Sequence, residues 1–265
     1  ITCCNKMKTA IICLLLHCTV QGEAFLSKFG SWGLVSNQSL PLQMALIVSQ
    51  LEDLGIKVQV ILASQSPRRR EILDMMGLKG KYTVCPSPLD ESLLQKSLSN
   101  EDPKVYTRRL AEEKARALAE ELSGEVVLPT LVLGSDTIVD LEGKILEKPL
   151  DAEAAIRMLH LLSGQTHEVH TGVAIFGVMR QPPFVQMISS FTETAQVQFA
   201  VLTDDDISSY VKTGEPMDKA GAYGIQGIGG QLVTNISGDF FTVMGLPMHR
   251  TSVEITRSLK ILINA

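Results

Sequence analysis

The residues richest in reactive groups form a basic segment that follows directly on an apolar run. Residues 58–63 are apolar apart from one glutamine, and residues 64–70 read Ser-Gln-Ser-Pro-Arg-Arg-Arg. This pattern predicts a strand, a tight turn and a helix, with Ser66 as the N-cap and Pro67 in the first turn, where a missing N–H costs nothing. Free backbone N–H groups and three arginines would therefore meet at the positive end of one helix.

Such a helix end predicts an anion site. The hydroxyl of Ser64, the free N–H groups and the guanidinium groups of Arg68 and Arg69 suit a polyphosphate better than a single carboxylate. The alternative is an ordinary capped helix whose basic face is solvated. This segment alone does not separate the two interpretations.

An aspartate inside an apolar run is the second candidate. Residues 131–139 read Leu-Val-Leu-Gly-Ser-Asp-Thr-Ile-Val, a pattern typical of a buried central strand. A carboxylate in such a strand loses its hydration, at a large cost in free energy, unless it is paired, hydrogen-bonded or bound to a metal. We therefore favour a functional role for Asp136 over a structural one.

Two lysines are further candidates. Lys114 lies beside the apolar stripe of a helix that is predicted to begin at Pro103 and end at Leu122. Taken alone, it is better explained as a snorkelling side chain. Lys148 ends a short strand that returns from a turn over residues 140–143.

Two other features carry little weight by themselves. The glycine-dense loop over residues 218–230 lets backbone approach a ligand closely, but it lacks the order of a dinucleotide-binding motif. His167 and His170 stand three residues apart on a predicted strand, so they point to opposite faces, and no cysteine lies near them. A zinc site built on this pair is therefore rejected.

Length and composition predict one large α/β domain or two small ones. Of the 265 residues, 45% are hydrophobic and 20% are charged, and the net charge is −5. This acidic balance argues against a nucleic-acid partner, so we expect the arginines to receive a small anionic ligand. Cys85 is the lone cysteine after residue 20, so we expect no disulfide in the body of the protein and a cytoplasmic location.

The first 43 residues are interpreted separately. Residues 6–8 are basic at both ends, residues 10–16 are apolar and residues 22–24 are mostly small, which is the order of a secretory signal. We keep a signal as the lesser alternative to a disordered extension in front of a domain over residues 44–265. The apolar run is too short to span a bilayer, so we expect no membrane partner.

Residues 44–265 are expected to fold as one domain of strands and helices, without internal repeats. Alternating residues predict a hairpin of two long strands over residues 165–178 and 184–201. The other expected elements are strands near 81–85 and 231–236 and helices after Asp102, Asp151, Thr203 and Pro247.

Five blocks of the sequence resemble the Maf family of nucleoside triphosphate pyrophosphatases. They are residues 63–69, 134–139, 145–149, 162–167 and 218–227. Their order and spacing match the family from about residue 57 to the C-terminus, and together they are specific where any one block is not.

Two shorter segments narrow this resemblance. Residues 214–217 and 238–240 are especially similar to the Maf-like domain of an animal protein that also has a methyltransferase half. These 265 residues leave no room for such a half, so methyl transfer is not expected of this chain.

The resemblance implies a fold and a reaction. The fold is an elongated mixed β-sheet with flanking helices around a central cleft, related to the inosine triphosphatase fold, and a homodimer is the family expectation. The reaction is hydrolysis of a nucleoside triphosphate to the monophosphate and pyrophosphate, with a divalent cation. The subfamily that prefers dTTP and UTP has an arginine, a threonine and a glutamine at the positions of Arg68, Thr137 and Gln226.

The resemblance also implies roles for residues. Asp136 matches the proton acceptor, and Glu91, in a loose match to the family's acidic loop, would help it hold Mg²⁺ or Mn²⁺. Hard oxygen ligands favour these ions over zinc. Lys148 is expected to act in catalysis, and the expected substrate-binding residues are Ser64, Arg68, Arg69, Lys114, Thr137 and Gln226.

Two other functions remain open from the sequence. One is a non-catalytic nucleotide-binding or regulatory module, which Asp136 and Lys148 argue against, because a binding protein gains little from a carboxylate that faces a triphosphate. The other is a pyrophosphatase for purine or modified nucleotides, since a small ring substituent changes the free energy of binding by only ~1–3 kcal/mol.

Overall fold

A computed structural model describes Ile47 and residues 52–182 and 184–264 of the protein. The chain divides into two units, residues 1–44 and residues 45–265. The expected extension over residues 1–43 lies outside the described residues. The following description concerns the second unit.

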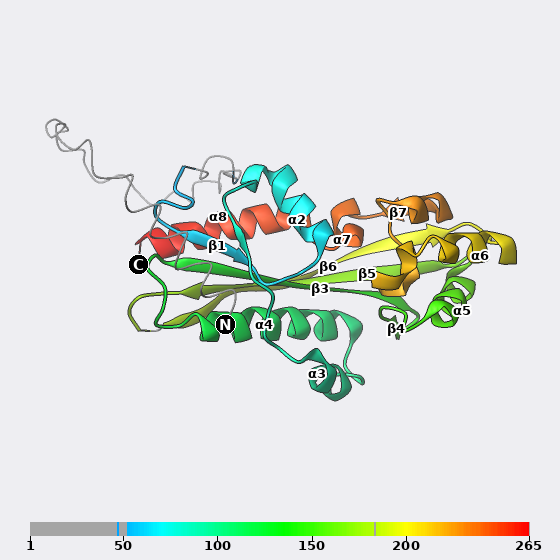
Figure 1. The fold of residues 1–265 in the computed structure, drawn as a ribbon, viewed down its shortest axis with the longest axis horizontal. Helices are drawn as coiled ribbons and strands as arrows, with labels where there is room; N and C mark the ends of the chain where they lie inside the picture. The colour runs from blue at the N-terminus through cyan, green and yellow to red at the C-terminus, as the bar shows by residue number, and fades with distance from the viewer. Residues whose placement is uncertain (1–46, 48–51, 183, 265) are drawn as a thin grey trace, which may run out of the picture. The chain divides into compact units, whose positions relative to one another are not determined.

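Within the described residues, seven strands form one mixed sheet (Figure 1). Their order is β2-β1-β3-β5-β6-β7, and β4 pairs with β3. β1 runs parallel to β2 and β3, and the other pairs are antiparallel. The strands are β1 (Gln59–Leu62), β2 (Thr83–Val84), β3 (Thr130–Leu141), β4 (Lys144–Leu146), β5 (Thr166–Val178), β6 (Val185–Phe199) and β7 (Val233–Ser237).

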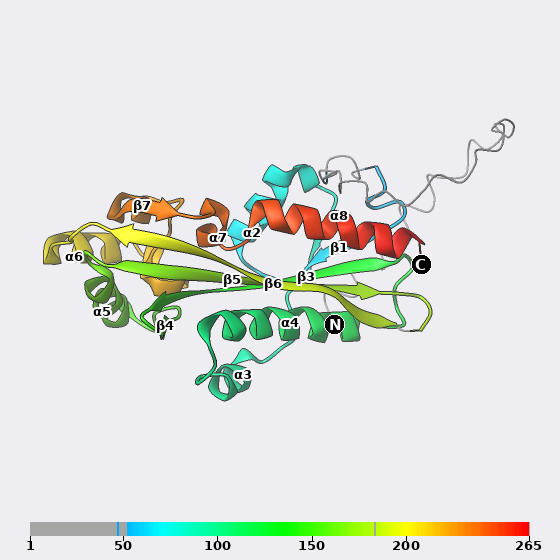
Figure 2. The ribbon, with the colours of Figure 1, turned by 180° about the vertical axis from the view of Figure 1, so that it is seen from behind.

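Helices cover both faces of this sheet (Figures 1 and 2). α4 (Pro103–Glu121) packs along one face, and α3 (Glu91–Ser97) lies against α4. The other face carries α2 (Pro67–Leu73), α7 (Phe240–Met244) and α8 (Met248–Asn264). α5 (Ala152–Leu162) and α6 (Asp204–Lys212) pack against each other near β4 and β7. The expected mixed sheet with flanking helices is confirmed.

Buried apolar side chains hold these layers together. One core cluster joins Leu62 and Leu133 of the sheet to Leu73 of α2 and Leu259 of α8. A second cluster lies between α5, α6 and the ends of β5 and β6 and includes Leu159 of α5. α2, α5, α6 and α8 therefore each bury an apolar face, which is the main source of stability for helices of this length.

The two histidines of β5 enter different environments. His167 lies in the second cluster, where its Nε2 is 2.9 Å from the hydroxyl of Tyr223 and its ring packs edge-on against Phe199. Burial lowers the pKa of His167 to about 4, so its ring is neutral at pH 7. His170 Nε2 lies 3.3 Å from a carboxylate oxygen of Asp140. The two imidazoles thus face different partners, as their spacing on a strand predicts.

Glycines allow α4 to approach the sheet closely. A Cβ atom at Gly134 would lie 2.4 Å from the carbonyl oxygen of Ala111, and one at Gly172 would lie 2.4 Å from that of Thr107. Gly172 is paired with Asp136 across β3 and β5. The closest approach of the helix therefore occurs beside Asp136.

Most expected elements form where the sequence places them. The side chains of Asp102, Asp151 and Thr203 accept hydrogen bonds from the first turns of α4, α5 and α6. The expected long hairpin corresponds to β5 and β6.

The structure differs from the sequence-based expectations at three places. Glu91 is the first residue of a helix that was not expected, α3, which Asp90 caps by accepting a hydrogen bond from Ser92 N–H. The short helix α7 was not expected. Ser66 stands at the N-cap position of α2, but its side chain makes no capping hydrogen bond, and its N–H donates to Ser64 Oγ at 3.2 Å.

The cysteines at residues 3, 4, 13 and 18 lie outside the described residues, so the expectation about disulfides stays a prediction. As to a membrane, none of the helices in the described ranges has the length and apolar character needed to cross one.

The contact between α4 and the sheet can be tested with two glycine variants. Gly172→Ala is expected to reduce the free energy of unfolding by about 1–3 kcal/mol, because the new methyl group meets backbone that cannot move alone. Gly177→Ala is the control, since its Cβ would meet only side-chain atoms of Ile188 and Leu262. Urea unfolding measures both, and equal losses would contradict the rigid contact with α4.

Candidate active site

The candidate site lies at an opening along one side of β3, between the segments of β3 that pair with β1 and with β4. One side of β3 is paired with β5 along almost its whole length. On the other side, β1 pairs with residues up to Leu133, and β4 begins to pair at Val139. Residues 134–138 have no strand partner on this side within the described part of the chain. Asp136 and Thr137 line a pocket at this opening.

Two segments of the chain lie on either side of this opening. After β1 the chain turns away through Ser64 and enters α2, which carries Arg68 and Arg69. After β4 the chain passes through Glu147 and Lys148. Arg68, Arg69, Glu147 and Lys148 line the same pocket as Asp136. The fold therefore brings residues 63–69 and residues 145–149, two of the blocks that the sequence analysis selected, to the same pocket as Asp136.

Arg69 is bound firmly into the structure. Its guanidinium group donates hydrogen bonds to Ser64 Oγ at 3.0 Å, to Thr137 Oγ1 at 3.2 Å and to the carbonyl oxygen of Gly245 at 2.9 Å. Burial lowers the pKa of Arg69 to about 10, which leaves the group charged at pH 7. Arg69 thus ties α2 to β3 and α7 and keeps a fixed positive charge at the pocket.

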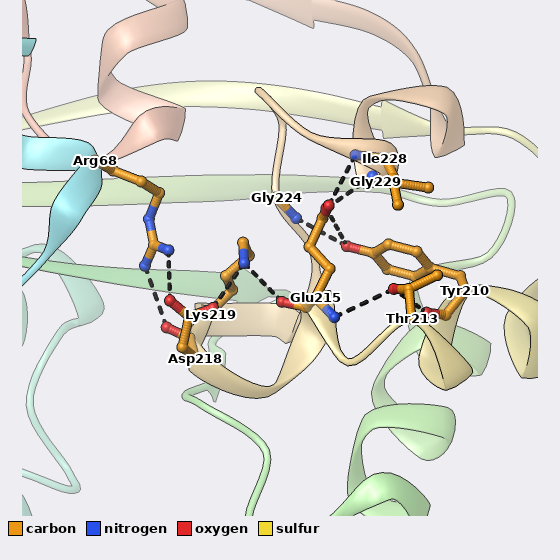
Figure 3. A network of polar contacts seen from close by, with 9 residues as sticks. All are labelled: Arg68, Tyr210, Thr213, Glu215, Asp218, Lys219, Gly224, Ile228 and Gly229. Carbon is orange, nitrogen blue, oxygen red and sulfur yellow. Dashed lines mark hydrogen bonds and ion pairs between the residues drawn. The ribbon is translucent and has the colours of Figure 1, made fainter. Parts of the chain in front are cut away.

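Arg68 and Arg70 differ in position, as a helix with 3.6 residues per turn requires. Arg68 points across the opening and donates to a carboxylate oxygen of Asp218 at 2.8 Å and to the Asp218 carbonyl at 3.2 Å (Figure 3). Its side chain is 17% exposed. Arg70 is exposed and is not part of this pocket.

A buried ammonium group lies between the two expected metal ligands. Lys114 Nζ is 2.6 Å from Asp136 Oδ1 and 2.7 Å from Glu91 Oε2. Burial alone would lower the pKa of Lys114, but the carboxylates of Asp136 and Glu91 raise it above its ordinary value. Lys114 is therefore charged at neutral pH. The alternative of a snorkelling lysine does not fit, because its ammonium group is directed inward.

Glu147 is a site residue that the sequence analysis did not select. Its carboxylate accepts hydrogen bonds from the hydroxyl of Tyr106 and from Gln95 Nε2, the latter at 2.9 Å. Burial raises the pKa of Glu147, and the negative charges of Asp136 and Glu91 raise it further. Its position directly before Lys148, in the block that precedes Pro149, is the signal in the sequence that indicates it.

Lys148 and Gln226 stand at the pocket with free side chains. Both are exposed, and within the described residues neither makes a hydrogen bond or an ion pair. Lys219, also at the pocket, donates instead to Asp218 and to the carbonyl of Glu215 (Figure 3). Lys148 and Gln226 are therefore able to meet a ligand without breaking a contact.

The residues of the pocket fit a divalent cation of the Mg²⁺ type. Asp136, Glu91 and Glu147 supply hard oxygen atoms. A cation would offset the negative charges of Asp136 and Glu91, which add to the effect of burial on the pKa of Glu147. Mg²⁺ is usually held by one or two carboxylates together with substrate phosphates and water. Asp136 and Glu91 could supply those two carboxylates once Lys114 yields part of its contact with them.

A second group of possible ligands lies outside the pocket. Oxygen and nitrogen atoms of Asp140, Glu168 and His170 lie within 4.8 Å of one another. The fold already supplies partners for this group: His170 Nδ1 bonds with Thr194 at 2.9 Å and Asp140 accepts from Gly143 N–H at 2.7 Å. A structural network accounts for these contacts without an ion.

Comparison with known proteins identifies the family. The model of the Maf-like protein family matches residues 59–258, which is more than half of the chain. The chain belongs to the Maf family. The matched range includes both segments beside the opening and the residues of the candidate site described above.

Individual proteins similar to this Maf protein are named as pyrophosphatases. A protein of Koribacter versatilis, named dTTP/UTP pyrophosphatase, is 46% identical over 191 residues, covering 72% of this chain and 90% of its own length. One of Moorella thermoacetica with the same name is 48% identical over 190 residues, with the same shares covered. A human protein named probable bifunctional dTTP/UTP pyrophosphatase/methyltransferase is 42% identical over 201 residues, which are 75% of this chain and 32% of the human one.

A solved structure of the Ham1 protein of Staphylococcus aureus is a distant match. It is 14% identical, the match covers 77% of this chain and 97% of that chain, and the TM-score is 0.34.

The different positions of Arg68 and Arg70 lead to a binding prediction. Arg68→Ala is expected to weaken the binding of inorganic triphosphate by ~10-fold or more, the loss typical of a hydrogen-bonded charge pair. Arg70→Ala should change it less than about twofold, because an exposed charge contributes little. Titration calorimetry measures both. Equal losses would mean that the arginines act as a diffuse positive patch.

Proposed function

We propose that this chain hydrolyses dTTP and UTP to the nucleoside monophosphate and pyrophosphate. The observation that carries the proposal is the convergence of Asp136, Arg68 and Lys148 from separate elements on one pocket. The names of the bacterial relatives, at 46% and 48% identity, support the same reaction and the same two substrates. We place the activity in residues 44–265.

In the proposed reaction, the oxygen of water attacks the α-phosphorus. The bond between this phosphorus and the oxygen that bridges it to the β-phosphate breaks, and pyrophosphate leaves. Asp136 is proposed to take the proton of the water. Its Oδ1 is bonded to Lys114, whereas Oδ2 receives no hydrogen bond from the described residues and is free to accept one from water. A positioned base of this kind typically accelerates a reaction by 10²–10⁴-fold.

The cationic side chains would stabilise the charge that develops on the phosphate oxygens. Arg68 and Lys148 are proposed to contact the triphosphate, and Arg69 to add its fixed charge behind them. Ser64, Lys114 and Thr137 are held by contacts with these groups, so we propose that they shape the site around the phosphates. A bound Mg²⁺ or Mn²⁺ would neutralise phosphate charge, and Asp136 and Glu91 are proposed to hold it.

Gln226 is proposed to contact the nucleobase. Arg68 and Thr137 also match the subfamily that prefers dTTP and UTP, so we propose that the site prefers pyrimidine nucleotides. The preference between canonical and modified pyrimidines would depend on the shape of the pocket around the base. We further propose, from the sequence and the family, a homodimer in the cytoplasm that binds no nucleic acid.

The reaction itself is tested by product analysis. Purified protein with Mg²⁺ and each common nucleoside triphosphate is expected to release pyrophosphate from dTTP and UTP, and chromatography should show the monophosphate. Release of orthophosphate with formation of a diphosphate, or preference for GTP or ATP, would overturn the proposal. Absence of any turnover would favour the non-catalytic binding module.

The role of Asp136 is tested by Asp136→Asn, which preserves the shape of the side chain. Turnover of dTTP is expected to fall by ~10²-fold or more, because the proton acceptor is lost. Asp136 is also a proposed metal ligand, so turnover is measured across a Mg²⁺ titration. Near-normal turnover at saturating Mg²⁺ would exclude Asp136 as the base.

A further inference from the structure

The glycine-rich loop over residues 224–229 wraps around a carboxylate. Glu215 begins the short helical turn η3 (Glu215–Asp218), and its side chain reaches into the loop (Figure 3). Its Oε1 accepts a hydrogen bond from Gly229 N–H and its Oε2 accepts one from Ile228 N–H, both at 2.9 Å. The loop therefore directs these backbone donors away from the pocket and toward Glu215.

Tyr210 completes this contact from α6. Its hydroxyl donates to Glu215 Oε1 at 2.9 Å and accepts from Gly224 N–H at 3.1 Å. Tyr210 is buried, with 4% of its surface exposed. Burial alone would raise the pKa of Glu215, but the N–H groups of Gly229 and Ile228 hold it below its ordinary value. Glu215 is thus an ionised acceptor for the donors at one end of the loop, and the hydroxyl of Tyr210 accepts from the other end.

The glycines of the loop are explained by this packing. A Cβ atom at Gly227 would lie 2.5 Å from Glu215 Oε2, and one at Gly229 would lie 2.5 Å from the hydroxyl of Tyr210. One at Gly224 would lie 2.5 Å from Cε of the Lys219 side chain and 3.2 Å from Glu215 Oε1. Glycine is required because the loop closes on Glu215 and Tyr210. A phosphate cradle does not explain these positions.

Gln226 is the residue that the loop presents to the pocket. It lies between the anchored positions Gly224 and Ile228, its side chain is exposed, and it makes no hydrogen bond within the described residues. A glycine-rich segment has many accessible backbone conformations, so an isolated loop would not hold Gln226 in one place. The hydrogen bonds to Glu215 and Tyr210 restrict those conformations.

We propose that Glu215, supported by Tyr210, is a positioning residue that fixes residues 224–229 and so gives Gln226 the position in which it distinguishes nucleobases. Glu215 itself does not touch the substrate. The inference rests on the proposed function, because the contact of Gln226 with the base is part of that proposal.

The same turn offers a contrasting residue at its other end. Asp218 binds Arg68 through its side chain at 2.8 Å and through its carbonyl at 3.2 Å (Figure 3). Arg68 is proposed to contact the triphosphate, which every nucleotide has. A change at Asp218 should therefore alter affinity for all nucleoside triphosphates alike, whereas a change at Glu215 should alter the discrimination between bases.

The test compares Glu215→Gln with Asp218→Asn in the full chain. A glutamine has one acceptor oxygen, so in Glu215→Gln at least one loop N–H would face an NH₂ group. Glu153→Gln on α5 is the matched control, because its carboxylate is 87% exposed and far from the loop in sequence. Tyr210→Phe is a milder variant that keeps Glu215 and removes the acceptor for Gly224 N–H.

Two measurements are made on each variant. Hydrogen exchange of the loop amides is expected to become at least ~10-fold faster in Glu215→Gln and to stay unchanged in Asp218→Asn and Glu153→Gln. Titration calorimetry without divalent ion gives the ratio of the dissociation constants of dGTP and dTTP. This ratio is expected to fall by ~10-fold in Glu215→Gln, less in Tyr210→Phe, and not in Asp218→Asn, where both constants should change together.

Each outcome decides the inference. Unchanged loop exchange in Glu215→Gln, faster exchange with an unchanged ratio, or a wild type that binds both nucleotides equally or not at all would overturn it. If Glu215→Gln does not fold, Tyr210→Phe decides by the same two measurements. A wild type that binds dTTP selectively but releases no pyrophosphate would instead overturn the proposed function and leave the positioning role of Glu215 supported.

Discussion

The buried ion pair of Lys114 with Asp136 and Glu91 is the interaction on which the arrangement of the site depends. A charged ammonium group beneath a sheet loses its hydration, and only close carboxylates can compensate for that loss. The distances of 2.6 and 2.7 Å require α4 to lie almost in contact with β3 and require α3 to bring Glu91 over the end of the lysine. Gly134 and Gly172 allow the first of these approaches, since any side chain there would collide with α4.

Much of the framework was predictable because its causes are local. The capping aspartate before α4 and the alternating residues of β5 and β6 each act over a few positions, and a sequence displays such patterns directly. α3 escaped prediction because it buries none of its residues fully and so lacks an apolar stripe. The position of Asp136 at a pocket was also predictable, because the cost in free energy of a carboxylate inside an apolar strand is visible from its neighbours in sequence.

The contacts that give the site its character come from distant parts of the chain. Glu147 is held by Tyr106 and Gln95, which precede it by 41 and 52 residues, and no local pattern links the three. The partner of the glycine-dense loop is likewise not visible from the local sequence. The composition of this loop indicated close approach to something, but the partner in the structure is Glu215 of the same chain. Composition shows that backbone must come close, and only the fold shows to what.

The opening in the edge of β3 has a consequence for the behaviour of the protein in solution. Residues 134–138 lack a strand partner there among the described parts of the chain, a length close to that of an ordinary strand. Unpaired strand edges invite pairing with other chains and so promote aggregation. Here the stretch is buried or half-buried, and an incoming strand would have to strip water from the guanidinium, ammonium and carboxylate groups that surround it. The charges that suit the pocket to a polyphosphate therefore also oppose the pairing of this stretch with a strand of another chain.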